Sequence, residues 1–258
     1  MILRQSGVPF VAPSVKERAV DDHSAAFEFL ERLESGDFDM VVVMTGVGLA
    51  FWRDIVAAKA PEERLGAALR KAVIVSRGTK PVPILRALKV PVGVMIPEPN
   101  TWREIVEAVA ARTERRIAIQ EYGRPNLELN AAFEAMGATV TPFALYRWEM
   151  PDDREPLRQA ARDLASGTVD VAIFTSSIQL DHLLELAAEA HLAEAVLDSL
   201  RRRVVVASVG PVMTAALQAR GIEPDIIPIQ PKMGALVKAT AEGAAQALAA
   251  KAKGGRPR

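Results

Sequence analysis

The chain contains no cysteine and only three histidines, His23, His182 and His191, among its 258 residues. The absence of cysteine excludes disulfides, thiolate zinc sites, iron–sulfur clusters and cysteine nucleophiles. With so few histidines, two of which fall in one helical stretch, a metal site built from imidazole is not expected either. The ordinary metal and thiol chemistries are therefore set aside at the outset.

Neither sign of charge is in excess, because 32 Lys and Arg balance 32 Asp and Glu. A strong basic field, which would indicate nucleic acid or an anionic membrane as a partner, is missing. No apolar run reaches the ~18 residues of a membrane span, and the N-terminal MILRQSGVPF carries no cleavable signal. We expect a soluble cytoplasmic protein with neither nucleic acid nor membrane as a partner.

Short apolar runs alternate with amphipathic stretches along the chain. The runs are mostly β-branched and show no polar alternation, as in strands buried on both faces; they are Met40–Met44, Ala72–Val75, Val90–Met95, Arg116–Gln120, Val171–Phe174, Val204–Ala207 and Asp225–Ile229. Helical patterns lie between them at 23–34, 102–111, 127–136, 179–189 and 213–220. This alternation predicts an α/β fold with parallel sheets.

The two halves of the chain resemble each other. Asp39 followed by MVVVMTGVG aligns with Asp170 followed by VAIFTSSIQ, a shift of 131 residues (170 − 39). The stretch 72–78 aligns with 204–210 at nearly the same shift. A repeat of this length predicts two similar α/β domains in one chain.

Two corresponding Pro-flanked segments, around residues 12–20 and 143–151, are interpreted as a pair of linker strands. The predicted organisation is a discontinuous first domain, a continuous second domain and a basic, frayed tail. Their ranges are 1–13 with 152–250 for domain 1, 14–22 and 143–151 for the linker, 23–142 for domain 2, and 251–258 for the tail.

The first domain is one strand and one helix shorter than the second. Residues 136–143 align with residues 6–13, but the strand and helix that precede them, 116–135, have no counterpart. We therefore expect two flavodoxin-like parallel-sheet domains, the first lacking its initial βα unit of roughly 20 residues. The alternative is that this half of the protein simply has one unit fewer.

Glycine- and hydroxyl-rich turns follow several of the predicted strands. Carboxyl ends of parallel strands are where such folds bind ligands, and free N–H groups at helix starts favour anions. The candidate binding residues are Thr45, Gly46, Val47, Arg77, Gly78, Thr79, Tyr122, Gly123, Thr175, Ser176, Ser177, Gln179, Gly210 and Thr214. For each turn taken alone, helix capping by Ser or Thr is the alternative reading.

Basic residues flank these turns and could meet carboxylates; they are Arg77, Lys80, Arg124 and Lys232. Tyr146, one of only two tyrosines, lies on the proposed linker, where it serves either chemistry or packing. The nucleotide-binding reading of Met44-Thr-Gly-Val-Gly48 is weak, because a third glycine and a later acidic partner are missing.

In their order and spacing, five stretches resemble the uroporphyrinogen-III synthase family over nearly the whole chain. They are Asp39-MVVVMTGVG, IVSRGTK ending at Lys80, Gln120-EYGRPN with Ala131-AFEAMGATVTPFALYRW, Asp170-VAIFTSSIQ, and Val206-ASVGPVMTAALQARGIEPD. The family has two domains, a discontinuous first domain and a two-stranded linker. The resemblance implies a lyase of porphyrin and heme biosynthesis, which cyclises hydroxymethylbilane to uroporphyrinogen III with inversion of ring D.

The resemblance also implies that no cofactor or metal takes part, that the substrate lies in a cleft between the domains, and that hydroxymethylbilane synthase supplies it. Tyr146 falls on the family's linker tyrosine, which assists departure of the substrate hydroxyl as a general acid. The turns of both domains would bind the eight carboxylates of the tetrapyrrole.

Two departures from the family pattern stand out. Relatives carry a hydroxyl just after the Gly-Pro turn, where this chain has Val212 and Met213, and relatives begin with the strand and helix that have no counterpart here. A non-catalytic protein that binds or senses a tetrapyrrole or another polyanion is the first alternative. A two-lobed solute receptor of the periplasmic type is the second.

Overall fold

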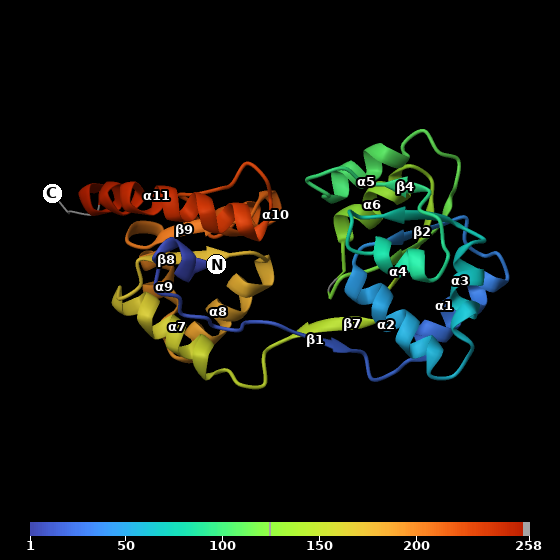
Figure 1. Cartoon of the computed structure of the whole chain (residues 1–258), viewed down its shortest axis with the longest axis horizontal. Coiled ribbons are helices and arrows are strands. Elements are labelled where there is room, and N and C mark those ends of the chain that lie inside the picture. Colours follow the sequence, from blue (N-terminus) through green and yellow to red (C-terminus); the bar gives the residue numbers. More distant parts are fainter. Residues whose placement is uncertain (124, 255–258) are drawn as a thin grey trace. The chain divides into compact units, whose positions relative to one another are not determined.

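The computed structural model describes residues 1–123 and 125–254 and divides the chain into two compact units. Unit 1 comprises Met1–Lys16 with Met150–Arg258, and unit 2 comprises Glu17–Glu149 (Figure 1). Each unit is a separate α/β body, as the repeat in the sequence predicts.

Unit 2 is built on a parallel sheet with the strand order β4-β3-β2-β5-β6. Counted from β5, this order reads 2-1-3-4-5, which is that of flavodoxin, so the chain enters the unit at the third strand of that pattern. The elements are α1 (Ser24–Glu34), β2 (Met40–Val43), α2 (Gly46–Ala57), α3 (Glu62–Leu69), β3 (Val73–Ser76), α4 (Val82–Ala87), β4 (Val94–Met95), α5 (Trp102–Val109), β5 (Arg116–Gln120), α6 (Leu127–Ala135) and β6 (Thr139–Phe143).

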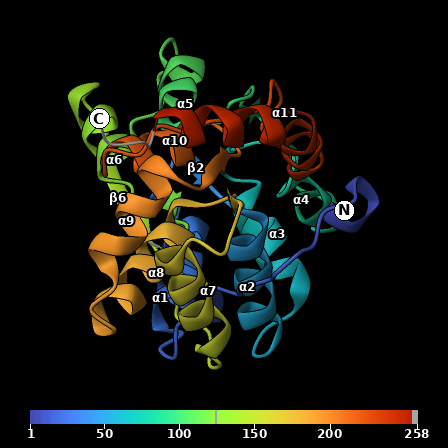
Figure 2. The ribbon, with the colours of Figure 1, turned by 90° about the vertical axis from the view of Figure 1, so that its left-hand side faces the viewer.

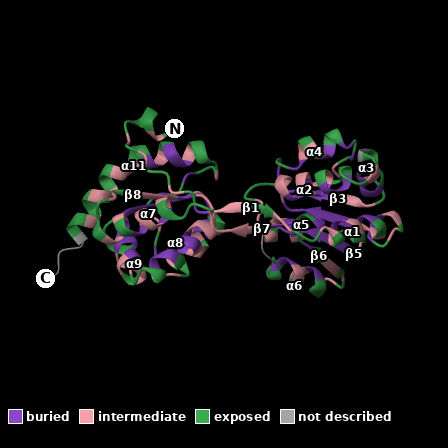
Figure 3. Ribbon diagram, turned by 90° about the horizontal axis from the view of Figure 1, so that it is seen from below, coloured by how far each residue is buried: buried purple, intermediate pink, exposed green. Residues whose placement is uncertain are grey.

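Helices cover both faces of this sheet, which explains the continuous apolar runs in the sequence. Val41 and Val43 of β2 pack into one core with α1, α2 and α3, whereas Met40 and Val42 face α5 and α6. All four side chains are buried, and the strands form the purple interior of the unit (Figure 3). Every residue of such a strand contributes to a core, so polar alternation is absent.

Unit 1 is centred on two parallel strands, β8 and β9. Helices α7, α8 and α9 lie on one side of this pair and α11 on the other (Figures 1 and 2). The elements are the 3-10 helix η1 (Ile2–Gln5), α7 (Glu155–Ser166), β8 (Val171–Phe174), α8 (Ser177–Glu189), α9 (Ala193–Arg202), β9 (Val205–Ser208), α10 (Pro211–Gln218) and α11 (Met233–Gly254).

The strand expected over 225–229 does not form. Only Ile226 bridges to Ala207 of β9, while Ile227 is half exposed and Ile229 is fully exposed. A run of isoleucines predicts a strand by composition, but a ladder also needs a neighbouring backbone along its whole length.

The two edges of β8 differ from those of its counterpart β2. In unit 2, β2 pairs with β3 on one side and β5 on the other, whereas β8 pairs with β9 and, within the described residues, with no second strand. Residues 9–13, which align with β6, are not a strand either. Val8, Phe10 and Val11 are accordingly exposed. Whether a βα unit completes this sheet stays a prediction.

The predicted linker segments contain β1 (Lys16–Ala19) and β7 (Tyr146–Glu149), which pair as a separate two-stranded sheet.

At the other end of the chain, residues 251–254 continue α11 instead of fraying, because the Lys251 ammonium lies 2.8 Å from the Asp225 carboxylate. Residues 255–258 lie outside the described part. No helix of the described residues is both long and apolar enough to cross a membrane.

Candidate functional site

The predicted binding turns of unit 2 lie at one edge of its sheet. Val43, the last residue of β2, is in register with Ser76 of β3 and with Gln120 of β5. Because the strands are parallel, the turns that follow them leave the sheet at the same, carboxyl edge. Thr45, Arg77 and Tyr122 therefore start from neighbouring positions.

Thr45 caps the N-terminus of α2 and lies beside Tyr146. Its hydroxyl accepts a hydrogen bond from the Gly48 backbone N–H at 3.0 Å, and its Oγ1 is 3.3 Å from the Tyr146 Oη. Gly46 and Val47 form the first turn of the helix. The capping expected of a threonine is thus present, but the same oxygen also contacts a phenol that is 101 residues away in the sequence.

Tyr146 is only 1% exposed, although it lies on the linker strand β7. Its ring stacks on Phe51 with a centroid distance of 5.8 Å. Burial raises the pKa of the phenol to about 12, and the hydrogen bond with Thr45 lowers it only in part. The group therefore keeps its proton at neutral pH, the state that a general acid requires.

Arg77 brings a cation to the same edge. Its guanidinium carbon lies 4.9 Å from the centroid of the Tyr122 ring, and its Nε–H donates to the Asn100 carbonyl at 2.8 Å. Burial lowers the pKa of Arg77 from its usual value, and the nearby Tyr122 and Tyr146 oppose this change. Within the described residues no carboxylate pairs with Arg77, so the remaining N–H groups suit an external anion.

Gly78 and Thr79 continue the turn after β3, where the Ser76 hydroxyl donates to the Gly78 carbonyl at 2.9 Å. Gly78 has a φ of +79°, in the left-handed region, whereas Thr79 and Lys80 are exposed. The turn therefore presents a hydroxyl and an ammonium to solvent.

Tyr122 and Gly123 follow β5, and the Tyr122 ring lies 5.7 Å from the ring of Trp148 on β7. Gly123 has a φ of +56°, and a Cβ there would come within 2.5 Å of the Trp148 ring. The Glu121 carboxylate accepts a hydrogen bond from the backbone N–H of Asn126 at 3.1 Å and so connects the end of β5 to the start of α6. Burial raises the pKa of Glu121. Arg124 lies outside the described residues.

The predicted turn of unit 1 after β8 is already occupied by a side chain. The Gln179 carboxamide oxygen accepts the N–H groups of Thr175 and Ser176 at 2.7 and 3.0 Å. Ser176 caps α8, and Ser177 is buried in its first turn. An external anion would have to displace Gln179 to reach these two N–H groups.

Gly210 caps α10, and Thr214 lies one turn further along the helix. The Thr214 hydroxyl is 2.9 Å from that of Ser208, which also donates to the Gly210 carbonyl at 3.2 Å. This serine-to-glycine contact repeats the one between Ser76 and Gly78 in unit 2. Val212, which follows the Gly-Pro turn, is half exposed, and Met213 is buried.

A comparison with protein-family models identifies the fold that carries these turns. The model described as uroporphyrinogen-III synthase HemD matches residues 2–238. The chain belongs to the uroporphyrinogen-III synthase family. The resemblance inferred from five sequence stretches is thereby confirmed.

Individual relatives are distant. The uncharacterized protein YjjA of Bacillus subtilis (strain 168) is 25% identical over 244 residues, covering 92% of this chain and 87% of YjjA. A putative uroporphyrinogen-III synthase of Methanothermobacter thermautotrophicus is 27% identical over 130 residues, half of each protein. A crystal structure of a mutant uroporphyrinogen III synthase from the extremely thermophilic bacterium Thermus thermophilus has a TM-score of 0.69 at 24% identity, covering 96% of this chain and 92% of that one. The last comparison supports the α/β fold.

In this member of the uroporphyrinogen-III synthase family, the tertiary structure adds residues that are not among the predicted binding residues. Gln120 contacts the Thr45 turn, Asn100 holds Arg77, and Trp148 lies against Tyr122 and Gly123. The sequence feature that could have indicated Gln120 is that it is a polar residue at the end of an otherwise mostly apolar strand. Asn100 and Trp148 gave no such signal.

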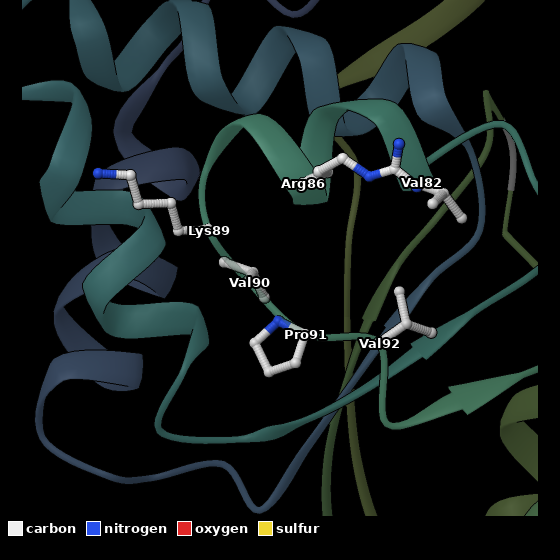
Figure 4. Close-up of a pocket in the computed structure, with 6 residues that line it drawn as sticks. All are labelled: Val82, Arg86, Lys89, Val90, Pro91 and Val92. Atoms are coloured by element: carbon white, nitrogen blue, oxygen red, sulfur yellow. The ribbon is translucent and has the colours of Figure 1, made fainter.

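Other parts of the molecule do not join the site. Among the described residues, no group of three or more His, Asp and Glu side chains could hold a metal ion. An open hollow beside α4 contains none of the predicted site residues (Figure 4); it is lined by Val82, Arg86, Lys89, Val90, Pro91 and Val92. His182 is buried, with its Nδ1 2.5 Å from the Ser14 carbonyl oxygen.

Proposed function

We propose that this protein is a uroporphyrinogen-III synthase, which cyclises hydroxymethylbilane with inversion of ring D. The observation that carries the proposal is the match of the family model to residues 2–238. The arrangement of Tyr146, Thr45 and Arg77 supports it, because a neutral phenol and a half-buried cation lie at the carboxyl edge of one sheet.

Tyr146 acts as the general acid in this proposal. Its O–H donates a proton to the substrate hydroxyl as the C–O bond breaks, and water leaves. The last pyrrole ring attacks the resulting azafulvene-type cation and turns over through a spiro intermediate. Ring closure then releases a pyrrole proton, which restores the phenol, so that the net reaction is the loss of one water. No cofactor or metal is needed in this scheme.

Substrate binding falls to the turns and to Arg77. The guanidinium of Arg77 binds one substrate carboxylate, and the hydroxyls and N–H groups of the turns of both units bind others. Holding one folded conformation of a flexible tetrapyrrole supplies most of the catalysis, because the same cation closes without inversion when it is unrestrained. A hydroxymethylbilane synthase is the expected source of the substrate. The predicted cleft between the domains stays a prediction.

The test is the isomer composition of the product. Hydroxymethylbilane is added to the purified protein, the products are oxidised, and the porphyrins are separated by chromatography. Predominantly type III porphyrin is expected, whereas a protein-free blank gives type I. Type I alone, from a protein shown to be folded by circular dichroism, would overturn the proposal.

The occupied turn of unit 1 favours one alternative, a protein that binds a polyanion without converting it. Gln179 uses two N–H groups that a substrate carboxylate would otherwise take. The two functions differ in the same assay, because a binding protein retains the tetrapyrrole and leaves the product as type I.

A further inference from the structure

Gln120 is the last residue of β5, and its side chain is completely buried. Both ends of its carboxamide are used. The Oε1 accepts the N–H of Thr45 at 3.2 Å, and the Nε2 donates to the Glu121 carbonyl oxygen. A buried amide with both donor and acceptor satisfied holds the backbone on either side of it in a fixed position.

The first turn of α2 is built around this side chain. A Cβ on Gly48 would lie 2.0 Å from the Gln120 Nε2 and 2.5 Å from its carboxamide carbon. No side chain larger than hydrogen is therefore accommodated at residue 48 while Gln120 keeps its place. Gly48 is also the residue whose N–H donates to the Thr45 hydroxyl at 3.0 Å.

The Thr45 hydroxyl connects this contact to Tyr146. Because Oγ1 already accepts from Gly48, its own proton is available for the Tyr146 oxygen, 3.3 Å away. When Thr45 donates in this way, the phenol proton of Tyr146 is free to point at a ligand. At 3.3 Å the contact is long for two hydroxyls, so a small displacement of the Thr45 turn decides whether it forms.

We propose that Gln120 is a positioning residue for the reaction. It holds the Thr45 turn so that the Thr45 hydroxyl donates to Tyr146 and the phenol proton is directed to the leaving hydroxyl of the substrate. This role rests on the proposed function, because it presupposes that Tyr146 is the acid that donates a proton to the substrate.

The corresponding turn of unit 1 is held differently. There, Gln179 reaches back from its own helix to the N–H groups of Thr175 and Ser176. Both tyrosines of the chain, Tyr122 and Tyr146, belong to unit 2, so unit 1 contains no phenol of its own. In unit 2, by contrast, a glutamine of the neighbouring strand holds the turn that contacts Tyr146.

The first experiment follows the tyrosines directly and does not depend on activity. Protein labelled with 13C at the phenol carbon of tyrosine gives two signals, because the chain has two tyrosines, and Tyr122→Phe identifies the signal of Tyr146. Gln120→Ala is expected to shift the signal of Tyr146. Gln159→Ala, on the surface of α7, serves as the matched control and is expected to leave it unchanged.

The second experiment is kinetic. Gln120→Ala is expected to lower kcat roughly 10- to 100-fold with KM nearly unchanged, because a misplaced acid impairs the chemical step more than binding. Val109→Ala also removes buried side-chain volume from unit 2, but Val109 belongs to α5 and makes none of the hydrogen bonds of this turn. It controls for lost stability, and its kcat should stay within about 2-fold of the wild type.

Gln120→Glu provides the conservative rescue and a pH signature. A neutral carboxyl reproduces both contacts of the amide, whereas a carboxylate repels the Glu121 carbonyl. Burial raises the pKa of the introduced carboxyl, so activity is expected at acidic pH and is lost as the pH rises through that pKa. The charged and titratable groups around the turn are Glu121 and Tyr122 after β5, Arg77 and Lys80 after β3, Glu17 on β1 and Tyr146 on β7.

The outcomes separate this role from the proposed function. An active wild-type protein in which Gln120→Ala leaves kcat and the Tyr146 signal unchanged overturns the role alone. An equal loss of kcat in Val109→Ala also overturns it, since any loss of stability would then suffice. A folded wild-type protein that yields only type I overturns the proposed function, and the tyrosine signals still report whether Gln120 orders the contact.

Discussion

At the scale of single residues, the site depends on the environment of two side chains that the sequence places far apart. Tyr146 is buried on a linker strand, and Arg77 is stacked on Tyr122 with no carboxylate partner among the described residues. Burial has opposite effects on the two. It favours the neutral phenol and disfavours the guanidinium cation. The same low-polarity surroundings would strengthen the attraction between this cation and an anionic ligand.

Tyr146→Phe is expected to lower kcat about 100-fold or more, because a general acid typically contributes 10²- to 10⁴-fold. The raised pKa of about 12 keeps the acid protonated, so kcat in the wild type should not fall as the pH rises towards 10, the ordinary phenol value. Steady-state rates from pH 7 to 10 check this expectation. An alkaline decline in the wild type that disappears in Tyr146→Phe would contradict it.

Asp39, directly before β2, gives a second prediction at this scale. Its carboxylate binds the Arg116 guanidinium and accepts the Arg116 N–H at 3.1 Å, which lowers its pKa from 3.8 to about 2. A lowered carboxyl pKa stabilises the fold above the unfolded value and loses that effect as the pH falls. The difference in unfolding free energy between wild type and Asp39→Asn should therefore shrink from pH 4 to pH 2 in urea titrations. A difference that grows would contradict this assignment.

At the scale of elements, helix α11 is attached to the sheet of unit 1 near its end. The Lys251 ammonium donates to the carbonyls of Leu200 and Val204 at 3.2 and 2.6 Å and pairs with Asp225. The two charged side chains are only 12% and 19% exposed. The helix consequently continues through the residues that composition alone assigns to a tail.

Lys251→Met is expected to lower the free energy of unfolding by about 2 kcal/mol, since it leaves Asp225 partly buried without its partner. Lys253→Met, two residues further along the same helix at an exposed position, is the matched control and should change it by less than about 0.5 kcal/mol. Urea denaturation measures both. Equal effects of the two substitutions would show that the ion pair does not anchor the helix.

At the scale of the whole molecule, the two units share a repeat but differ at one sheet edge. Phe10 and Val11, in the segment that aligns with strand β6 of unit 2, and the preceding Val8 are 56%, 73% and 97% exposed. One edge of β8 has no partner strand among the described residues. An unpaired strand edge together with exposed apolar side chains favours self-association.

Replacing Val8, Phe10 and Val11 together by Ser is expected to reduce self-association in light-scattering measurements. The melting temperature should change little, because exposed side chains contribute little to the folded state. Leu127→Ser, which removes one isolated exposed apolar residue from unit 2, should leave self-association unchanged. A marked drop in melting temperature for the triple variant would mean that these side chains are covered in solution.

The sequence by itself determined the class of the fold, its duplication and the family. The strands Val171–Phe174 and Arg116–Gln120 form over the residues that the sequence predicts, because each has an apolar stretch at its centre that suits a strand covered by helices. The family match rested on order and spacing, which are also properties of the sequence. The strand expected at 225–229 does not form. Its composition suits a strand, but only Ile226 pairs with a neighbouring backbone, at Ala207 of β9.

Only the tertiary structure decided which polar groups meet. Thr45 contacts Gln120, 75 residues away, and Tyr146, 101 residues away, because β2 pairs with β5 and β7 passes the same edge. Composition cannot show that Gln179 occupies the N–H groups of its own turn while the turn of unit 2 depends on a neighbouring strand. Hydrogen bonds act over about 3 Å, so they depend on strand order and register, which no local pattern specifies.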